Sequence, residues 1–240
     1  MSRFAETCEA IGATTKKNEK IRILSDYLKS LDLEDGARVC VFFTGRAFPR
    51  REENVLAVGG SLLWQAIIEL THLSVDEMET IYRKHGDSGA AAQEALGRHV
   101  ATGKLTLEKV AAALQDLAAR RGPAQKLARL IELFKKAEPV EVKYLIKIIT
   151  GDLRIGLKEG LVEEAIAQAS GCPVVDVRRA NMLTGDIGTA FLLARENRLG
   201  TAELRLFHPI GFMLASPAES PAEVMGYYPE GVLAEDKYDG

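Results

Sequence analysis

The sequence repeats itself with a shift of 106 residues, and this internal repeat constrains the fold more than any other feature. The same mainly apolar pattern ending in Thr-Gly occurs twice, first as Lys20, Leu24, Leu28, Val39, Phe43, Thr44 and Gly45, then as Lys126, Leu130, Phe134, Leu145, Ile149, Thr150 and Gly151. Around these positions, apolar residues recur every three to four places, which is the spacing of one face of an α-helix. Each copy is therefore predicted to begin with amphipathic helices of the same kind.

Two further motifs follow in each copy, in the same order. Leu56-Ala-Val-Gly59 corresponds to Leu153-Arg-Ile-Gly156, and Gly86-Asp-Ser-Gly89 corresponds to Gly185-Asp-Ile-Gly188. The first copy also has a longer loop over 45–54. Chance similarity between amphipathic helices is the alternative, but the shared order of the turn motifs argues against it. We predict two related helical halves, roughly 14–100 and 122–198, packed as one body.

Local signals favour an all-α fold for the first 200 residues. Ser74 followed by Glu77 has the pattern of a capping box at a helix start. Pro123 and Pro173 suit early helical positions. The apolar run 39–43 fits a strand or a helix, and its context favours a helix. Aromatic residues make up only 6% of the chain, which is low for a sheet-rich protein.

The pattern changes after Thr201, where glycines and four prolines interrupt any helical spacing. The prolines are Pro209, Pro217, Pro221 and Pro229. We therefore predict a helical domain over 1–200 and an extended linker over 201–231. The last residues, 232–240, are predicted to form the first strand of a second domain that is truncated at Gly240.

Composition limits the compartment and the class of protein. No run of 18 apolar residues occurs, so a membrane-spanning helix is not expected. The first ten residues carry acids and lack the apolar stretch of a secretory signal, so we expect a protein that is not secreted. Cys8, Cys40 and Cys172 are far apart and odd in number, which fits neither a disulfide framework nor a metal site. We expect a monomer with reduced cysteines in the cytoplasm, or in the nucleus of a eukaryote.

The segment Thr150-Gly-Asp-Leu-Arg-Ile-Gly156 has the chemistry of a phosphate clamp. Its glycines permit left-handed backbone and close approach of another chain. A helix predicted to begin near Leu157 would direct free N–H groups outward, where they can bind a phosphate oxygen. Arg154 and Lys158 add positive charge on either side. The alternative is an ordinary helix stop followed by a new helix.

Basic residues gather in two places, although the net charge of the whole chain is −3. The clusters are Lys16, Lys17, Lys20 and Arg22 in one half, and Arg120, Arg121, Lys126, Arg129, Lys135 and Lys136 in the other. Such clusters can neutralise phosphates, or they can be solvated faces of surface helices. If each half held one backbone of a duplex, binding would be independent of sequence and sensitive to salt.

The chain ends in Lys237-Tyr-Asp-Gly240, a K-x-D-G pattern that suggests nucleotidyl transfer. A lysine amine becomes a nucleophile when burial or nearby cations lower its pKa. It can then attack the α-phosphate of a nucleotide while a divalent metal offsets the developing charge. By itself the four-residue pattern also fits an exposed polar tail.

Taken together, these motifs resemble those of ATP-dependent DNA ligases over nearly the whole chain. The segment 150–159 with Val162 and 165–167 resembles the signature that ends the ligase DNA-binding domain. Lys84-His-Gly-Asp-Ser-Gly89 resembles a second family element, K-x-G-D-x-G, and the segment 207–215 resembles the linker before the nucleotidyltransferase domain. The segment 206–211 departs from the family's usual sequence pattern of arginine and proline, which we interpret as a subfamily variation.

The resemblance implies that the helical domain holds nicked duplex DNA from the minor-groove side. Lys237 would carry AMP derived from ATP, Glu235 would contact the adenine, and Mg²⁺ would assist. Both cofactors would need domains beyond Gly240, so this chain is expected to bind DNA without sealing nicks, and no metal ligands are expected within it. The expected DNA-binding residues are Lys16, Lys17, Gly59, Gly86, Gly89, Lys126, Gly151, Leu153, Arg154, Gly156, Leu157 and Lys158.

Two alternatives remain open from the sequence. RNA ligases and capping guanylyltransferases also use K-x-D-G, although the large helical region upstream argues against them. A helical-repeat scaffold that binds other proteins is the other alternative, and it predicts no salt-dependent affinity for duplex DNA.

Overall fold

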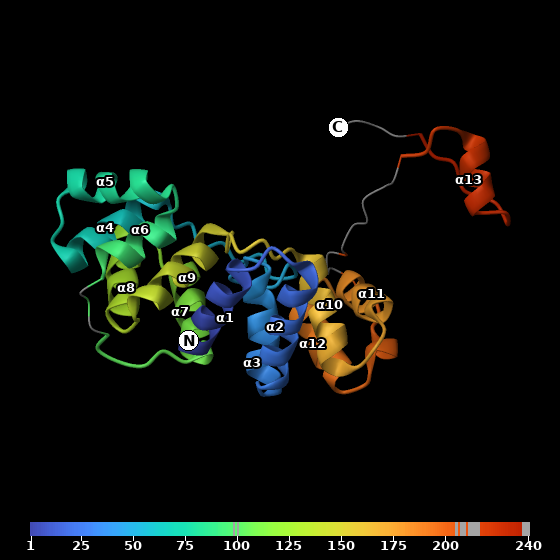
Figure 1. Cartoon of the computed structure of the whole chain (residues 1–240), viewed down its shortest axis with the longest axis horizontal. Helices are drawn as coiled ribbons and strands as arrows, with labels where there is room; N and C mark the ends of the chain where they lie inside the picture. The colour runs from blue at the N-terminus through green and yellow to red at the C-terminus, as the bar shows by residue number, and fades with distance from the viewer. Residues whose placement is uncertain (98, 100, 205, 207–209, 211–216, 237–240) are drawn as a thin grey trace.

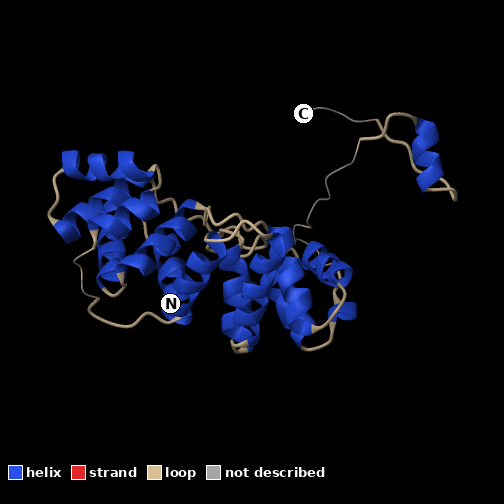
Figure 2. Cartoon of the chain, in the orientation of Figure 1, coloured by secondary structure: helices blue, strands red, loops and turns tan. Residues whose placement is uncertain are grey.

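The computed structural model describes residues 1–97, 99, 101–204, 206, 210 and 217–236, and in that part of the chain the fold is all-α (Figures 1 and 2). The helices are α1 (Ser2–Gly12), α2 (Lys17–Lys29), α3 (Leu33–Phe43), α4 (Gly60–Thr71), α5 (Val75–His85), α6 (Ser88–Ala95), α7 (Leu107–Ala119), α8 (Pro123–Lys135), α9 (Pro139–Thr150), α10 (Glu159–Ser170), α11 (Val174–Thr184), α12 (Ile187–Arg195), the 3-10 helix η1 (Leu199–Thr201) and α13 (Pro221–Tyr227). The predicted helix over 39–43 is confirmed as the end of α3.

The two related halves are present, and they exchange helices. Helix α2 of the first half packs against α10 of the second, and α8 of the second half packs against α4 of the first. In the same way α3 packs against α12, and α9 against α6. Figure 1 shows the blue helices α2 and α3 beside the orange helices α10 and α12. Each of the two helical bundles therefore takes two helices from one half and three from the other.

Close backbone contacts repeat under the same exchange. A Cβ added to Gly89 would lie 2.6 Å from the carbonyl oxygen of Lys143, and one added to Gly188 would lie 2.9 Å from that of Ala37. Ala37 and Lys143 are equivalent positions of the repeat, as are the two glycines. The same glycine therefore permits the same close helix approach in both bundles.

The two Thr-Gly turns meet where the halves are related to each other. Gly45 and Gly151 are equivalent, and both adopt left-handed backbone, with φ of 79° and 87°. A Cβ on Gly45 would lie 2.8 Å from the carbonyl oxygen of Gly151. Equivalent residues that touch lie on the local twofold axis of the pair, so this axis passes between these turns.

The structure corrects the register of the repeat after this point. Lys20 Nζ donates to the carbonyl of Ile155, and the equivalent Lys126 Nζ donates to that of Leu56. The residues that follow, Gly156 and Ala57, both have positive φ, of 65° and 45°. Leu56 therefore corresponds to Ile155. The shared L-x-[VI]-G motif instead predicts Leu153, two residues earlier, as its counterpart. The lysine bond and the left-handed residue set the register here, because they fix where the next helix starts.

Helix α1 lies outside the repeat and ties the two halves together. Its Phe4 is fully buried, with its ring centroid 4.9 Å from that of Phe43 and 6.4 Å from that of Tyr144. Phe43 comes from the first half and Tyr144 from the second. One aromatic cluster thus contributes to the continuous core across both halves.

The predicted helix starts are confirmed in detail. Ser74 and Glu77 form a complete capping box at α5, and Pro123 is the first residue of α8. Pro173 is the N-cap of α11. The aspartates of the two equivalent G-D-x-G motifs, Asp87 and Asp186, cap α6 and α12 with their carboxylates.

The segment after η1 departs from the extended linker that the sequence predicts. Pro221 begins the short helix α13, because its fixed φ and missing N–H suit a first helical position, and Ser220 caps the helix. Residues 232–236 have no regular structure, so the expected strand is not found in the described part. Lys237–Gly240 lie outside the described residues, and the domain boundaries stay a prediction.

The three cysteines are free thiols. Burial raises the pKa of the thiols of Cys8 and Cys40 well above the ordinary value. Among the described helices, none combines the length and the apolar character needed to span a membrane.

We expect Gly45→Ala to lower the free energy of unfolding by about 2–4 kcal/mol. The added Cβ strains a left-handed backbone and also meets the Gly151 carbonyl. Gly171→Ala is the matched control, because Gly171 has a similar φ of 68° with open space around it, and about 1 kcal/mol is expected. Urea unfolding measures both, and equal losses would contradict the close contact at the axis.

Candidate nucleic-acid interface

Two equivalent turns follow Gly45 and Gly151, the residues at the local twofold axis, and lead into helices. The first, residues 55–59, leads into α4, and the second, residues 154–158, leads into α10. We call each of these two sites a cradle. A cradle consists of the turn, the first residues of the helix that follows it, and the N-terminus of a helix from the other half. Cradle A combines residues 154–160 with the start of α2, and cradle B combines residues 55–61 with the start of α8.

Cradle A borders an open groove of about 730 Å³. The groove is lined from the α2 side by Gly12, Thr14, Thr15, Lys17 and Lys20, and from the α10 side by Arg154, Ile155, Gly156, Lys158, Gly160, Leu161 and Glu164. Lys17 and Lys158 are both exposed. The exchange of helices between the halves therefore brings two basic segments, distant in the sequence, to one groove.

Neither cradle has a side-chain cap on its helix. Lys158 at the start of α10 and Gly59 at the start of α4 make no capping hydrogen bond, and both residues are exposed. Helices α5, α6 and α12 are capped by serine or aspartate, whereas α1, α2, α8 and α11 share the missing side-chain cap. The first N–H groups of α4 and α10 are thus available to an external acceptor, such as a phosphate oxygen.

A buried lysine holds each turn in place through a hydrogen bond to one of its carbonyls. Lys20 and Lys126 are only 6% and 7% exposed. Each donates to the carbonyl just before the left-handed residue of the turn in the other half. Lys126 was expected at the DNA surface, but its ammonium is occupied by the carbonyls of Leu56 and Ala57. Its geometry suits holding the turn in place rather than reaching a phosphate.

The remaining expected contact residues divide by exposure. Leu153 is 3% exposed and packs in the core, and Gly89 is buried against Lys143. Leu157 is half-buried. The exposed positions are Lys16, Lys17, Gly59, Gly86, Gly151, Arg154, Gly156 and Lys158.

Arg154 joins the two expected family elements. Its backbone is left-handed, with φ of 51°, and its N–H donates to the carboxylate of Asp152 at 2.8 Å. Its guanidinium donates to the carbonyl of Gly86 at 2.9 Å and lies 3.6 Å from Asp87. The G-D-S-G turn and the turn before α10 therefore form one continuous surface.

Asp87 is the centre of this junction. It accepts a hydrogen bond from Ala90 N–H and forms a 2.9 Å ion pair with the buried Lys147. Burial works to raise the pKa of Asp87, but the Ala90 hydrogen bond and the cations Lys147 and Arg154 outweigh it and lower the pKa below its ordinary value. The carboxylate is therefore held in its charged form.

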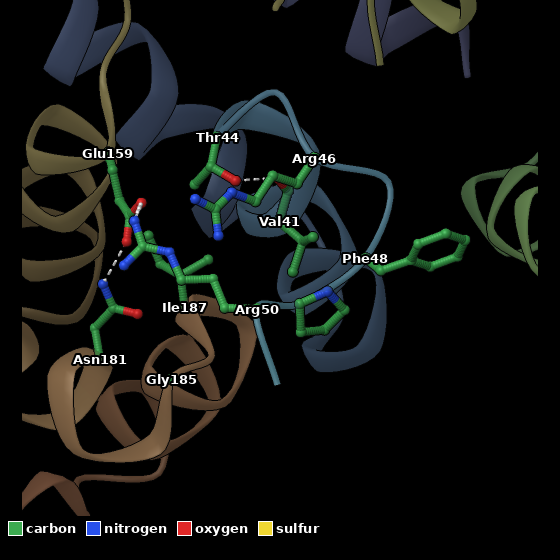
Figure 3. Close-up of a pocket in the computed structure, with 10 residues that line it drawn as sticks. Val41, Thr44, Arg46, Phe48, Arg50, Glu159, Asn181, Gly185 and Ile187 are labelled. Atoms are coloured by element: carbon green, nitrogen blue, oxygen red, sulfur yellow. Dashed lines mark hydrogen bonds and ion pairs between the residues drawn. The ribbon is translucent and has the colours of Figure 1, made fainter. Parts of the chain in front are cut away.

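The insertion 45–54 of the first half supplies arginines that the site prediction missed. Arg50 forms a 2.8 Å ion pair with Glu159 at the start of α10, and Glu159 also accepts from Asn181 at 2.9 Å (Figure 3). Arg51 pairs with Asp186 at 3.2 Å. Ion pairs therefore join the extra loop to the second half. The three arginines in this loop are the sequence feature from which its part in the site could have been predicted.

Arg46 points into the same pocket as Arg50 (Figure 3). Burial lowers the pKa of Arg46, and the positive charge of Arg50 lowers it further, while Glu159 opposes this change. The pocket holds little free space, about 10 Å³, so it has room for no more than a water molecule.

Several members of the basic clusters are neutralised within the chain. Arg22 pairs with Asp26, and Arg120 and Arg129 pair with Asp116. For these residues the geometry fits the solvated-face interpretation. Glu235 is exposed, while Lys237 lies outside the described residues. The described residues contain no group of three or more His, Cys, Asp or Glu side chains arranged to hold a metal.

Comparison with known proteins gives consistent similarities. The family described as DNA ligase N terminus matches residues 1–167. A probable DNA ligase of Koribacter versatilis is 50% identical, over 100% of this chain and 42% of the relative. A probable DNA ligase of Opitutus terrae is 40% identical over 93% and 25%, and a DNA ligase of Methanothermobacter thermautotrophicus is 35% identical over 99% and 44%. The chain spans less than half the length of these relatives.

We expect Asp87→Asn to lower the free energy of unfolding at neutral pH by about 2 kcal/mol, because asparagine can still cap α6 but leaves Lys147 without its ion pair. A lowered pKa stabilises the fold above the ordinary value of 3.8, and that contribution is lost as the pH falls through the lowered pKa. The difference between variant and wild type should therefore shrink in acid.

Urea unfolding at neutral and acidic pH measures this effect. Asp26→Asn is the control, since the Arg22–Asp26 pair is more than half exposed and should change stability little. A loss in Asp87→Asn that is the same at both pH values would contradict the role of its charge.

Proposed function

Because the chain belongs to the DNA ligase N-terminal family, we propose that it holds duplex DNA for a ligase that seals nicks. The observation that carries this proposal is the pair of equivalent, uncapped helix starts beside the local twofold axis. The two strands of a duplex are also related by local twofold axes. Each cradle then faces one sugar-phosphate backbone and donates N–H groups to it, without contacting bases.

Basic side chains add to this grip at cradle A. Lys16, Lys17, Arg154 and Lys158 are exposed around one turn. Each phosphate neutralised by such a cation releases counterions, so the affinity falls as salt rises. Gly86 and Gly151 would lie at the same surface, where a missing side chain lets the DNA backbone approach.

Buried members of the expected contact set would act through the turns they support. Lys126 would hold the turn of cradle B at the carbonyl of Leu56, and Leu153 and Gly89 would keep helices and turns in place by packing. Leu157 would shape the entry to α10.

For the longer protein we propose an ATP-dependent DNA ligase. Lys237 would be the nucleophile that takes AMP, and Glu235 would contact the adenine. A bound Mg²⁺ would offset charge on the phosphates during transfer. The alternative of an RNA ligase or capping enzyme is less favoured, because the matched family is that of DNA ligases. We expect a monomer acting in the cytoplasm, or in the nucleus of a eukaryote.

Charge reversal at cradle A, Arg154→Glu with Lys158→Glu, is expected to weaken binding of a nicked duplex by at least about tenfold at low salt. Loss of two phosphate contacts should also reduce the slope of log affinity against log salt by about 2. Fluorescence anisotropy with a labelled nicked duplex measures both quantities.

Lys135→Glu with Lys136→Glu is the matched control, because both lysines are exposed at the far end of α8. It should change affinity much less. Thermal unfolding checks that the Arg154 variant keeps its fold, since Arg154 also binds Gly86. A wild-type chain with no salt-dependent affinity for duplex DNA would instead favour the protein-binding scaffold.

In the longer protein, Lys237→Arg is expected to abolish formation of the covalent adenylate, because an always-protonated guanidinium cannot attack the α-phosphate. Incubation with α-labelled ATP and denaturing electrophoresis measures the adenylate. DNA affinity should be unchanged in this variant. Labelling by GTP in place of ATP would support the capping-type alternative.

A further inference from the structure

The two cradles share the lysine-to-carbonyl hydrogen bond and the left-handed residue after it, although Arg154 and Gly122 have positive φ and their counterparts Val55 and Lys16 do not. A buried lysine binds the carbonyl of Ile155 in cradle A and of Leu56 in cradle B. A left-handed residue follows in each, and then an uncapped helix start at Lys158 or Gly59. With this register, each exposed position of one cradle has a defined counterpart in the other.

The side chains at these counterparts differ sharply in charge. Four cations of cradle A correspond to four uncharged residues of cradle B, in the pairs Lys16 and Gly122, Lys17 and Pro123, Arg154 and Val55, and Lys158 and Gly59. The uncharged positions are as accessible as the cations, and Val55 is 71% exposed. Burial therefore does not account for the missing charges.

Charged residues near the two cradles do not remove this difference in positive charge. On the cradle B side, Arg121 is exposed where cradle A has Thr15, and Arg120 is paired with Asp116. Glu52 and Glu53 lie in the loop that leads into cradle B. On the cradle A side, Glu159 is ion-paired with Arg50 and Glu164 with Arg178. Glu19 and Asp152 accept hydrogen bonds from the uncharged Thr14 hydroxyl and Arg154 N–H and keep their negative charge, so the four cations of cradle A outnumber the nearby carboxylates without an ion-pair partner.

We propose that the two cradles hold the two strands of a duplex unequally, cradle A mainly through charge and cradle B mainly through backbone N–H groups. This inference rests on the proposed DNA binding and adds a direction to it. A nicked duplex has one continuous and one broken strand, which are not interchangeable. If the two cradles bind their strands with different strength, the domain binds the nick in one preferred orientation. The two related halves of the protein would otherwise allow either orientation.

The first experiment neutralises phosphates on one strand at a time. The 240-residue chain is titrated with nicked duplexes that carry a block of methylphosphonates opposite the protein, on the continuous strand or on the broken strand. The expected result is an affinity loss of about tenfold or more for one strand and less than about threefold for the other. Equal losses would overturn the inference while DNA binding itself stands.

The second experiment gives cradle B the charges of cradle A. Val55→Arg with Gly59→Lys places cations at the counterparts of Arg154 and Lys158. Val55 is exposed, and Gly59 has φ of −87° with no atom within 4 Å of an added Cβ, so both changes fit the backbone. We expect tighter binding at low salt, a salt slope steeper by about 2, and a smaller difference between the two strands.

Val175→Arg with Gly200→Lys is the matched control, because it adds the same charges at an exposed valine and at an open glycine elsewhere. It should leave the strand difference as in the wild type. A strand difference that persists unchanged in the cradle B variant would overturn the inference. Absence of any salt-dependent duplex binding by the wild type would overturn the proposed function and this inference together.

Discussion

The architecture depends on two buried lysine-to-carbonyl hydrogen bonds that cross between the halves of the repeat. Lys20 binds Ile155 and Lys126 binds Leu56, each from a helix of the opposite half. A buried ammonium without acceptors would be costly, so each lysine requires the turn to present its carbonyl. The left-handed residue that follows and the start of the next helix are set by the same bond.

Exchange of helices explains why a duplicated sequence makes one body rather than two. Each half alone would leave the apolar faces of its first two helices without α10 and α12, or without α4 and α6. Pairing across the halves covers these faces and brings Gly45 beside Gly151 at the local axis. The turns that lead into α4 and α10 follow these two glycines in the chain, one in each half.

Charge is used differently on the two sides of that surface. Two of the three arginines in the insertion of the first half form internal ion pairs, Arg50 with Glu159 and Arg51 with Asp186. The second half leaves Lys158 exposed, and Arg154 more than half exposed beside Gly86. The two copies thus share the lysine-to-carbonyl bond and the left-handed residue after it, and they differ in where cations are available.

The sequence by itself determined the all-α class and helix starts such as the Ser74 capping box, because each depends on residues close together in the chain. It also determined the two related halves, because the same residue pattern occurs twice along the chain. It also predicted DNA contacts in cradle A from the motif over 150–159 and from the basic cluster at Lys16 and Lys17, and these contacts stay a prediction. The tertiary structure alone decided the exchange between halves, the two-residue correction of the register, and the burial of Lys126. These depend on contacts between residues far apart in the chain, such as Lys126 and Leu56. Helical periodicity and local turn chemistry carry no information about such contacts.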